Sequence, residues 1–261
     1  MGDENKTRDA VDAVTGLAKV VPVYEDVVQP AAKEIGVALQ RTIHMALAPI
    51  GGMVWGYEKI EQFLKDSLAK RLENVPPEQI KTPSPQVAGP AIEALKYTGH
   101  DKNLREMFAK LLATAMNKAT AAEVHPSFVE IIKQLNPDEA KICCILKKYE
   151  SFPVVNLIES NDDGSFCILV QNFSNLGGVA GCEFAAMIQS HLTNLTRLGL
   201  IEVVYGRQIQ GYEQQYAAIE SRPELKKFTE KIQAANHKFR FQRGCIDRTA
   251  FGHLFLNACI D

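Results

Sequence analysis

The sequence has almost no net charge and few aromatic residues. Among its 261 residues, 29 Lys and Arg stand against 31 Asp and Glu, which leaves −2 at neutral pH, and 8% of the residues are aromatic. No overall field would therefore draw the chain onto nucleic acid or anionic lipid, and any such binding has to come from a local surface. The composition, 46% hydrophobic and 23% charged, is that of a globular protein.

Cysteine patterns typical of metal sites are also lacking. The six cysteines form no C-x-x-C pair and no Cys–His pair at the spacing of a zinc site. The first residues, MGDENKTRD, are polar and have no apolar stretch behind them of the kind that a secretory signal needs. We therefore expect a cytoplasmic protein with reduced thiols and with no metal or other cofactor.

Phosphate-binding loops and hydrolase motifs are lacking as well. The nearest approach to a catalytic cluster is a set of histidines and carboxylates in the middle of the chain: His100, Asp101, Glu106, His125 and Glu130. Their spacing fits neither a zinc site nor a pair of catalytic carboxylates. Asp101 or Asn103 suits the cap of the next helix, and His125 suits the start of another. We expect no catalytic residues and no enzymatic activity.

One apolar run is long enough to raise the question of a membrane. Ile35–Tyr57 carries a single formal charge, Arg41, and has Trp55 and Tyr57 near its end. About 20 apolar residues with aromatic ends can cross a bilayer. A central Arg, however, costs about 2.5–3.5 kcal/mol on insertion. We favour a buried helical hairpin in the resting protein, and we keep open a membrane contact through Arg41, Trp55 and Tyr57 on activation.

Helical periodicity dominates the first half of the chain. Apolar residues recur at helical spacing over Thr7–Val20, from Pro30 to Pro49 and over about Val54–Glu73. Five prolines between residues 76 and 90 then predict an extended connector or a domain boundary. Further helices are expected over Ala91–Tyr97, Leu104–Lys118 and Pro126–Leu135. The predicted domains are a helical segment 1–75, a connector 76–90, a helical segment 91–135 and a last domain 136–261.

Residues 136–261 are patterned like a winged helix. A first helix, Asp138–Tyr149, is preceded by Asn136 as its cap. A strand-like Phe166–Phe173 follows, and a third helix over about Cys182–Leu198 leads through Gly199 into a strand with Ile201 and Val203, as in a recognition helix and its wing. A basic helix, about Pro223–Asn236, and a terminal helix capped by Thr249 close the chain. The core should include Ile142, Leu146, Leu195 and Leu198.

The predicted fold class is thus mainly α, with a helical N-terminal part and a winged-helix-like α+β C-terminal part. Six strings, in order along most of the chain, carry a family resemblance: VVPVYEDVVQPAAKEIG, ALAPIGGMVWGYEKI, AGPAIEALKYTGHDKNLREMFAKLLATAMNKAT, HPSFVEIIKQLNPDEAKI, LTNLTRLGLIEV and TAFGHLFLNACI. They resemble the bacterial abortive infection alpha (Abi-alpha) family of phage-defence proteins. The resemblance implies a role in abortive infection, and it brings no established catalytic residues.

A basic tract lies between Arg222 and Arg248, where eight Lys and Arg stand against three Asp and Glu. Its candidate contact residues are Arg222, Lys226, Lys227, Lys231, Lys238, Arg240 and Arg243. Three interpretations stay open: a nucleic-acid patch, a protein-docking surface and a solvated face. The third helix has only Glu183 and Arg197 as formal charges, so nucleic-acid binding would have to run through the tract.

We therefore expect a non-enzymatic anti-phage protein that acts by binding a protein partner or a phage-derived trigger, or by rearranging its conformation. Two alternatives stay open. One is a winged-helix DNA-binding regulator, and the other is an effector that perturbs membranes through Ile35–Tyr57. The sequence is also compatible with a homo-oligomer.

Overall fold

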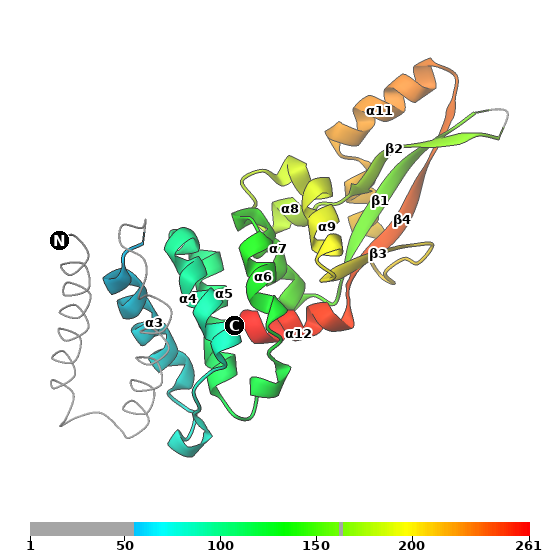
Figure 1. Ribbon diagram of the computed structural model, residues 1–261. Helices are drawn as coiled ribbons and strands as arrows, with labels where there is room; N and C mark the ends of the chain where they lie inside the picture. Colours follow the sequence, from blue (N-terminus) through cyan, green and yellow to red (C-terminus); the bar gives the residue numbers. More distant parts are fainter. Residues whose placement is uncertain (1–54, 162–163) are drawn as a thin grey trace, which may run out of the picture. The chain divides into compact units, whose positions relative to one another are not determined.

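The structure, a computed structural model, describes residues 55–161 and 164–261 (Figure 1). The chain divides into two compact units, one ending at Val129 and the other beginning at Glu130. The helices predicted over Thr7–Val20 and from Pro30 to Pro49 lie outside the described residues. Arg41 and most of the apolar segment Ile35–Tyr57 also lie outside them.

Three helices build the described part of the first unit. They are α3 (Tyr57–Leu72), α4 (Pro85–Thr98) and α5 (Lys102–Met116), with short 3-10 turns at Pro77–Gln79 (η2) and Ala121–Glu123 (η3). The predicted stripe on α3, Ile60, Leu64, Leu68 and Leu72, is buried, because its spacing of four places all four side chains on one face. An ion pair of 2.8 Å between Arg71 and Glu106 joins α3 to α5.

The proline-rich stretch 76–90 is only partly a connector. Pro85 begins α4, and the side chain of Ser84 caps this helix by accepting a hydrogen bond from the Gln86 N–H at 3.3 Å. A proline is tolerated in the first turn because the first N–H groups of a helix have no partner within it. Pro90 lies inside the helix, which therefore starts earlier than the predicted Ala91. Asp101 caps α5 through the Leu104 N–H, as one of the two predicted choices.

The second unit combines helices with one sheet. Helix α6 (Ser127–Gln134) crosses the boundary between the units. The elements that follow it in chain order are α7 (Pro137–Lys148), β1 (Ser151–Ser160), β2 (Phe166–Phe173), α8 (Leu176–Val179), η4 (Ala185–Met187), α9 (Ile188–Arg197), β3 (Ile201–Tyr205), α10 (Glu213–Glu220), α11 (Pro223–Ala234), β4 (Lys238–Arg248) and α12 (Ala250–Cys259). Asn136, the predicted cap, begins α7 and forms a capping box with Glu139, and Thr249 caps α12. Both predictions from local sequence are confirmed.

The four strands form one antiparallel sheet in the order β2-β1-β4-β3. Strand β1, which the sequence pattern does not predict, pairs with β2 on one side and with β4 on the other. Helices α10 and α11 pack on one face of the sheet. Their side chains form a core with those of β1 and β2: Val155, Leu157, Val170, Tyr216, Ile219, Leu225 and Ile232.

The winged-helix prediction is not confirmed. Helices α7 and α9 and strand β3 follow one another in the predicted order, and Leu195 is buried. However, α10 and α11 come between β3 and β4, so β3 does not turn straight into the next strand as a wing does. Leu198 is half-buried, and the neighbouring Leu200 is buried in the core. The described chain is therefore helix-rich with a curled four-stranded sheet near its C-terminus.

Candidate partner-binding pocket

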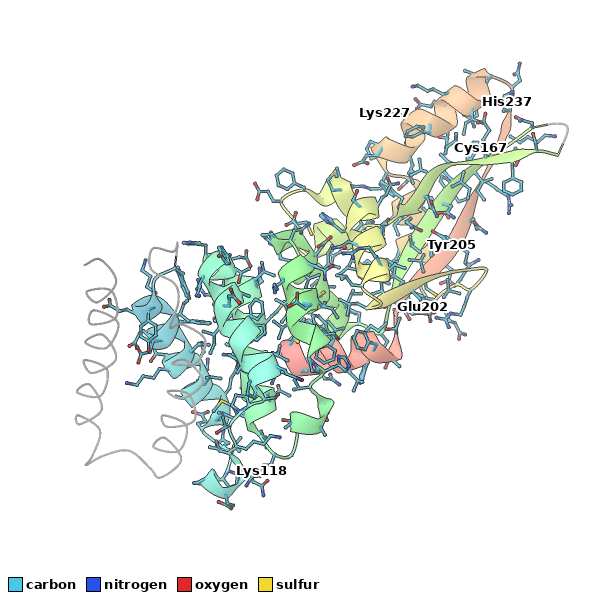
Figure 2. All side chains as sticks on the ribbon, viewed as in Figure 1. Lys118, Cys167, Glu202, Tyr205, Lys227 and His237 are labelled. Carbon is cyan, nitrogen blue, oxygen red and sulfur yellow. The ribbon has the colours of Figure 1, made fainter. Side chains whose placement is uncertain are left out.

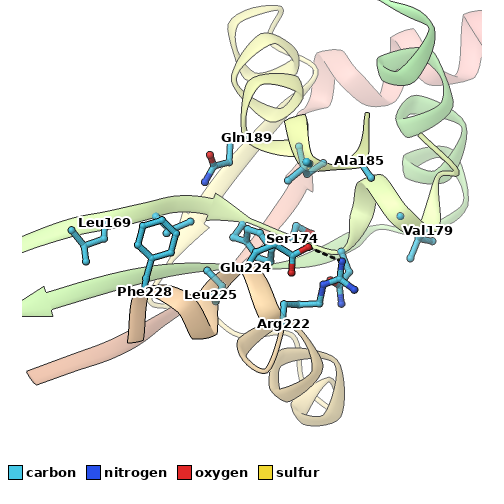
Figure 3. Close-up of a pocket in the computed structure, with 15 residues that line it drawn as sticks. Leu169, Ser174, Val179, Ala185, Gln189, Arg222, Glu224, Leu225 and Phe228 are labelled. Atoms are coloured by element: carbon cyan, nitrogen blue, oxygen red, sulfur yellow. Dashed lines mark hydrogen bonds and ion pairs between the residues drawn. The ribbon is translucent and has the colours of Figure 1, made fainter. Parts of the chain in front are cut away.

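An apolar pocket of about 490 Å³ opens beside the second half of β2 (Figure 3). One wall comes from β2 and α11, and the other from the segment that runs from α8 to the start of α9. Its apolar lining includes Leu169, Val170, Phe173, Val179, Ala185, Ala186, Ile188, Leu225 and Phe228. A cavity of this size is in the range of sites that hold a small ligand or a few side chains of a protein partner.

The end of β2 is shaped by an irregular backbone. Asn172 has a φ of +57°, in the left-handed region that Asn tolerates better than most residues. Its N–H donates to the side-chain oxygen of Asn156 at 2.9 Å, and the hydroxyl of Tyr205 donates to both asparagines at 2.7 and 2.5 Å. Burial raises the pKa of Tyr205 to about 12. This network fixes the backbone of β2 at its end, where the strand lines one side of the pocket.

Asp138 fixes the loop before α9. Its carboxylate accepts hydrogen bonds from the backbone N–H groups of Glu183 and Phe184, at 2.9 and 2.8 Å, and it pairs with Lys141 at 2.9 Å. Burial alone would raise the pKa of this carboxyl, but the hydrogen bonds from Lys141 and the two amides lower it to about 2. The predicted third helix therefore begins at Ile188 instead of Cys182, because Asp138 holds these backbone groups outside a helix.

A hydrogen bond joins the two walls of the pocket. The side-chain amide of Gln189, at the start of α9, donates to the backbone carbonyl of Gln171 in β2 at 2.7 Å. Further along α9, Asn194 donates to Glu139 at 2.9 Å and to the carbonyl of Gln134 at 3.2 Å. These polar side chains would read DNA bases in the winged-helix alternative. In the structure they hold α9 against its neighbours.

The rim of the pocket is apolar and exposed. Val179 and Phe228 line the pocket and have 53 and 41% of their surface exposed, and the exposed Phe184 and Met187, at 61 and 51%, are next in sequence to the lining residues Ala185 and Ala186. Single exposed apolar side chains are normal, but several around one pocket are typical of an interaction site. The mouth carries one ion pair, Arg222 with Glu224 at 3.2 Å, which is drawn as a dashed line in Figure 3.

The structure does not bring the predicted basic tract together on one face. Lys226, Lys227 and Lys231 are exposed on α11, and Figure 2 labels Lys227 there. Phe239 and Phe241 of β4 pack on the core beneath α10 and α11. Because side chains alternate along a strand, Lys238 and Arg240 lie on the opposite face of the sheet. Only Arg222 of the tract lines the pocket.

Arg243 has a structural role within the second unit. Its guanidinium donates to both oxygens of Glu220, at 2.6 and 2.9 Å, and lies 5.2 Å from the centre of the Tyr216 ring. The hydrogen bond with Glu220 raises the pKa of Arg243, and such a two-point contact holds α10 on the sheet. Arg243 is therefore the least available member of the tract for a partner.

Trp55 and Tyr57, the described residues of the proposed membrane contact, are half-buried. The Trp55 ring packs against Phe63 and His100, with centroids 5.6 and 6.5 Å apart, and Arg105 lies 5.8 Å from its centre. A side chain at Gly99 would collide with this ring, since an added Cβ would lie 2.3 Å from it. Within residues 55–161 and 164–261, no helix is long and apolar enough to cross a membrane.

The histidines and carboxylates in the middle of the chain form no metal-binding cluster within the described part of the protein. Asp101 is occupied as a helix cap, and the ring of His125 accepts a hydrogen bond from the Ser127 N–H at 3.1 Å at the start of α6. The pocket itself was missed by sequence reasoning. Its only local signal was the apolar run FCILV in the predicted strand Phe166–Phe173.

The sequence comparisons identify the family. The profile of the family described as abortive infection alpha matches residues 56–259, which include the pocket. The chain belongs to the abortive infection alpha family. No curated protein matches the chain. Among solved structures, a match is the structure of an uncharacterized protein from the hydrocarbon-degrading marine bacterium Alcanivorax borkumensis SK2. It has 19% sequence identity and a TM-score of 0.37, and the match covers 53% of this chain and 92% of that one.

Proposed function

We propose that the chain is a non-enzymatic anti-phage defence protein that binds a protein partner through the pocket beside β2. Membership of the abortive infection alpha family supports the role in defence. The observation that supports binding is the apolar pocket with its exposed apolar rim, because burial of such side chains is the main driving force of protein association.

The polar groups around the pocket fit a binding role better than a catalytic one. The hydroxyl of Ser174 donates to the carbonyl of Pro153 at 2.7 Å and accepts from the Leu176 N–H at 3.2 Å. It is therefore committed to the backbone and is not placed beside a base that would activate it. Gln189 is committed to Gln171, and Arg222 faces Glu224. The remaining lining is mainly apolar.

Helix α11, which supplies Leu225 and Phe228 to the pocket lining, also carries exposed lysines. Lys227 and Lys231 are exposed and follow one another at a helical spacing that places them on one face of α11. Such charges at the edge of an apolar site mainly raise the rate of association and select partners of the opposite charge. We therefore propose a partner whose apolar segment is bordered by carboxylates.

Phe228→Glu tests the proposal in cells. A matched control is Leu254→Glu, because Leu254 lies on α12 outside the pocket lining and is 43% exposed, against 41% for Phe228. Both variants should accumulate to similar levels and melt at similar temperatures, since the two side chains are exposed to the same degree. In bacteria infected with a phage that the wild-type protein restricts, Phe228→Glu should lose protection, and Leu254→Glu should keep it.

A photo-crosslinking side chain gives an independent measurement. Placed at position 228, it should yield a specific crosslinked protein in infected or uninfected cells. Placed at position 254, it should not yield that product. Full protection by Phe228→Glu, together with equal crosslinking from both positions, would contradict a role for the pocket.

A further inference from the structure

One edge of the sheet, strand β2, carries no charged residue from Phe166 to Val170. Strand β2 pairs with β1 only, so it forms one edge of the described sheet. Phe166, Ile168 and Leu169 are 65, 42 and 37% exposed, and Cys167 between them is an exposed free thiol. Natural edge strands usually carry a charge or a proline that prevents pairing with another strand. From Phe166 to Val170 this strand has neither.

The hairpin that joins β1 and β2 fixes which backbone groups face outwards. The N–H of Asn161 donates to the carbonyl of Ser165 at 2.9 Å, so these two residues form a hydrogen-bonded pair. The register continues through Ser160 opposite Phe166, Glu159 opposite Cys167 and Ile158 opposite Ile168. Because hydrogen-bonded and non-hydrogen-bonded pairs alternate, Cys167 directs its backbone groups towards β1, and Phe166 and Ile168 direct theirs towards the open edge.

We propose that two copies of the chain pair through this edge, β2 against β2, antiparallel about a two-fold axis at Cys167. In this register Phe166 of each copy lies opposite Ile168 of the other, and the outward backbone groups of both residues are satisfied. The two Cys167 residues face each other as a non-hydrogen-bonded pair, in which Cα atoms are about 4.5 Å apart. The interaction surface is therefore the segment Phe166–Ile168, and its partner is the same segment of a second copy.

The choice of a second copy rests on the self-complementarity of this segment. A two-fold axis places each side chain beside the same segment of the second copy, so a charged residue here would lie near an identical charge and be repelled by it. No charge is present from Ser165 to Val170. The pairing also places four exposed apolar side chains, two from each copy, on one face of the joined sheet, where aromatic–aliphatic cross-strand pairs are stabilising. This inference goes beyond the pocket proposal and does not depend on it.

The first test is the mass of the full-length protein in solution under reducing conditions. Sedimentation velocity over a range of micromolar concentrations should show a monomer–dimer equilibrium. Ile168→Lys should weaken the dimer about tenfold or more, because symmetry introduces the change twice and both apolar pairs are lost. Leu254→Lys, at a matched exposure on α12, should leave the equilibrium unchanged. A monomer at every concentration, or open-ended larger assemblies, would overturn the proposal.

The second test uses the thiol at the axis. In a variant with Cys144→Ser and Cys182→Ser, Cys167 remains as the exposed thiol, and the other three are buried. Mild oxidation should convert this protein into a covalent dimer, because the expected Cα separation suits a disulfide. Adding Cys167→Ser should abolish the crosslink while leaving the non-covalent dimer. A dimer that forms no Cys167 crosslink would contradict the register at this edge.

Discussion

The carboxylate of Asp138, in the first turn of α7, accepts a hydrogen bond from the backbone N–H of Phe184 at 2.8 Å. A single side chain thus positions a loop that is distant from it in the sequence. The loop carries the exposed Phe184 and leads into Ala185 and Ala186, which line the pocket. The pocket therefore depends on a residue that does not itself line it.

Asp138→Asn should destabilise the second unit. The variant keeps the size of the side chain but loses the charge that both amides and Lys141 contact, and hydrogen bonds to charged groups contribute about 1.5–3 kcal/mol each. We expect the free energy of unfolding, measured with urea, to fall by at least the contribution of one such bond, about 1.5–3 kcal/mol. Lys141→Ala is the control, because it leaves the amide contacts in place and removes a partly exposed ion pair worth about 1 kcal/mol or less. Equal losses in the two variants would contradict the role of the amides.

The same carboxylate should make stability depend on acid pH. The pKa of Asp138 lies at about 2 in the folded chain, below its ordinary value of 3.8, because the hydrogen bonds from Lys141 and the amides outweigh burial. A lowered pKa contributes stability that is complete above about pH 4 and is lost as the pH falls through about 2. The stability difference between wild type and Asp138→Asn should therefore be constant near neutrality and shrink between these values. A difference that is the same at low pH would exclude this linkage.

Leu195→Ala should be a strongly destabilising core substitution. Leu195 on α9 has no exposed surface, and truncation of such a leucine costs about 2–5 kcal/mol. Leu254→Ala, on the solvent side of α12, should change the free energy of unfolding by about 0.5 kcal/mol or less. Similar effects of the two substitutions would mean that α9 packs less tightly than the structure indicates.

Nucleic-acid binding, if the protein has it, should run through α11. Replacing Lys226, Lys227 and Lys231 together by Gln should abolish the binding, and the wild-type affinity should fall steeply with salt. Substitutions of Gln189 and Asn194 should have little effect, since both side chains bond within the protein. Binding measured by fluorescence anisotropy that resists salt and is lost in Gln189→Ala would instead favour the DNA-binding alternative.

The sequence predicted those elements that are marked by neighbouring residues, such as an apolar run or a capping side chain. The run FCILVQNF predicted β2 with the bounds that the structure has, and Asn136 and Thr249 predicted two helix starts through their capping side chains. Strand β1 was missed because its ten residues include Pro153 and Asn156 and show no regular alternation. Six consecutive residues of β1 are buried, because β1 is an inner strand between β2 and β4 and is covered on both faces. The strand order that places it there is not visible in its own sequence.

The pocket could not be predicted for a related reason. Its walls come from residues 169–189 and 222–228, which the sheet and α10 bring together. The contacts that fix the walls, from Asp138 to Phe184 and from Gln189 to Gln171, join different elements. No spacing within either segment indicates these partners. The basic tract was visible in the sequence, but its division between two faces of the sheet follows from strand alternation in β4.

The hold of Asp138 on the loop has a consequence for proteolysis. Phe184 and Met187 are bulky side chains of the kind that many digestive proteases cleave after, and both are more than half exposed. Cleavage, however, needs an extended backbone, which this segment can adopt only after its amides leave the carboxylate. The rate of nicking at Phe184 then reports how often the loop opens while the rest of the unit stays folded. Limited digestion thus measures, without any partner, how rigid this side of the pocket is.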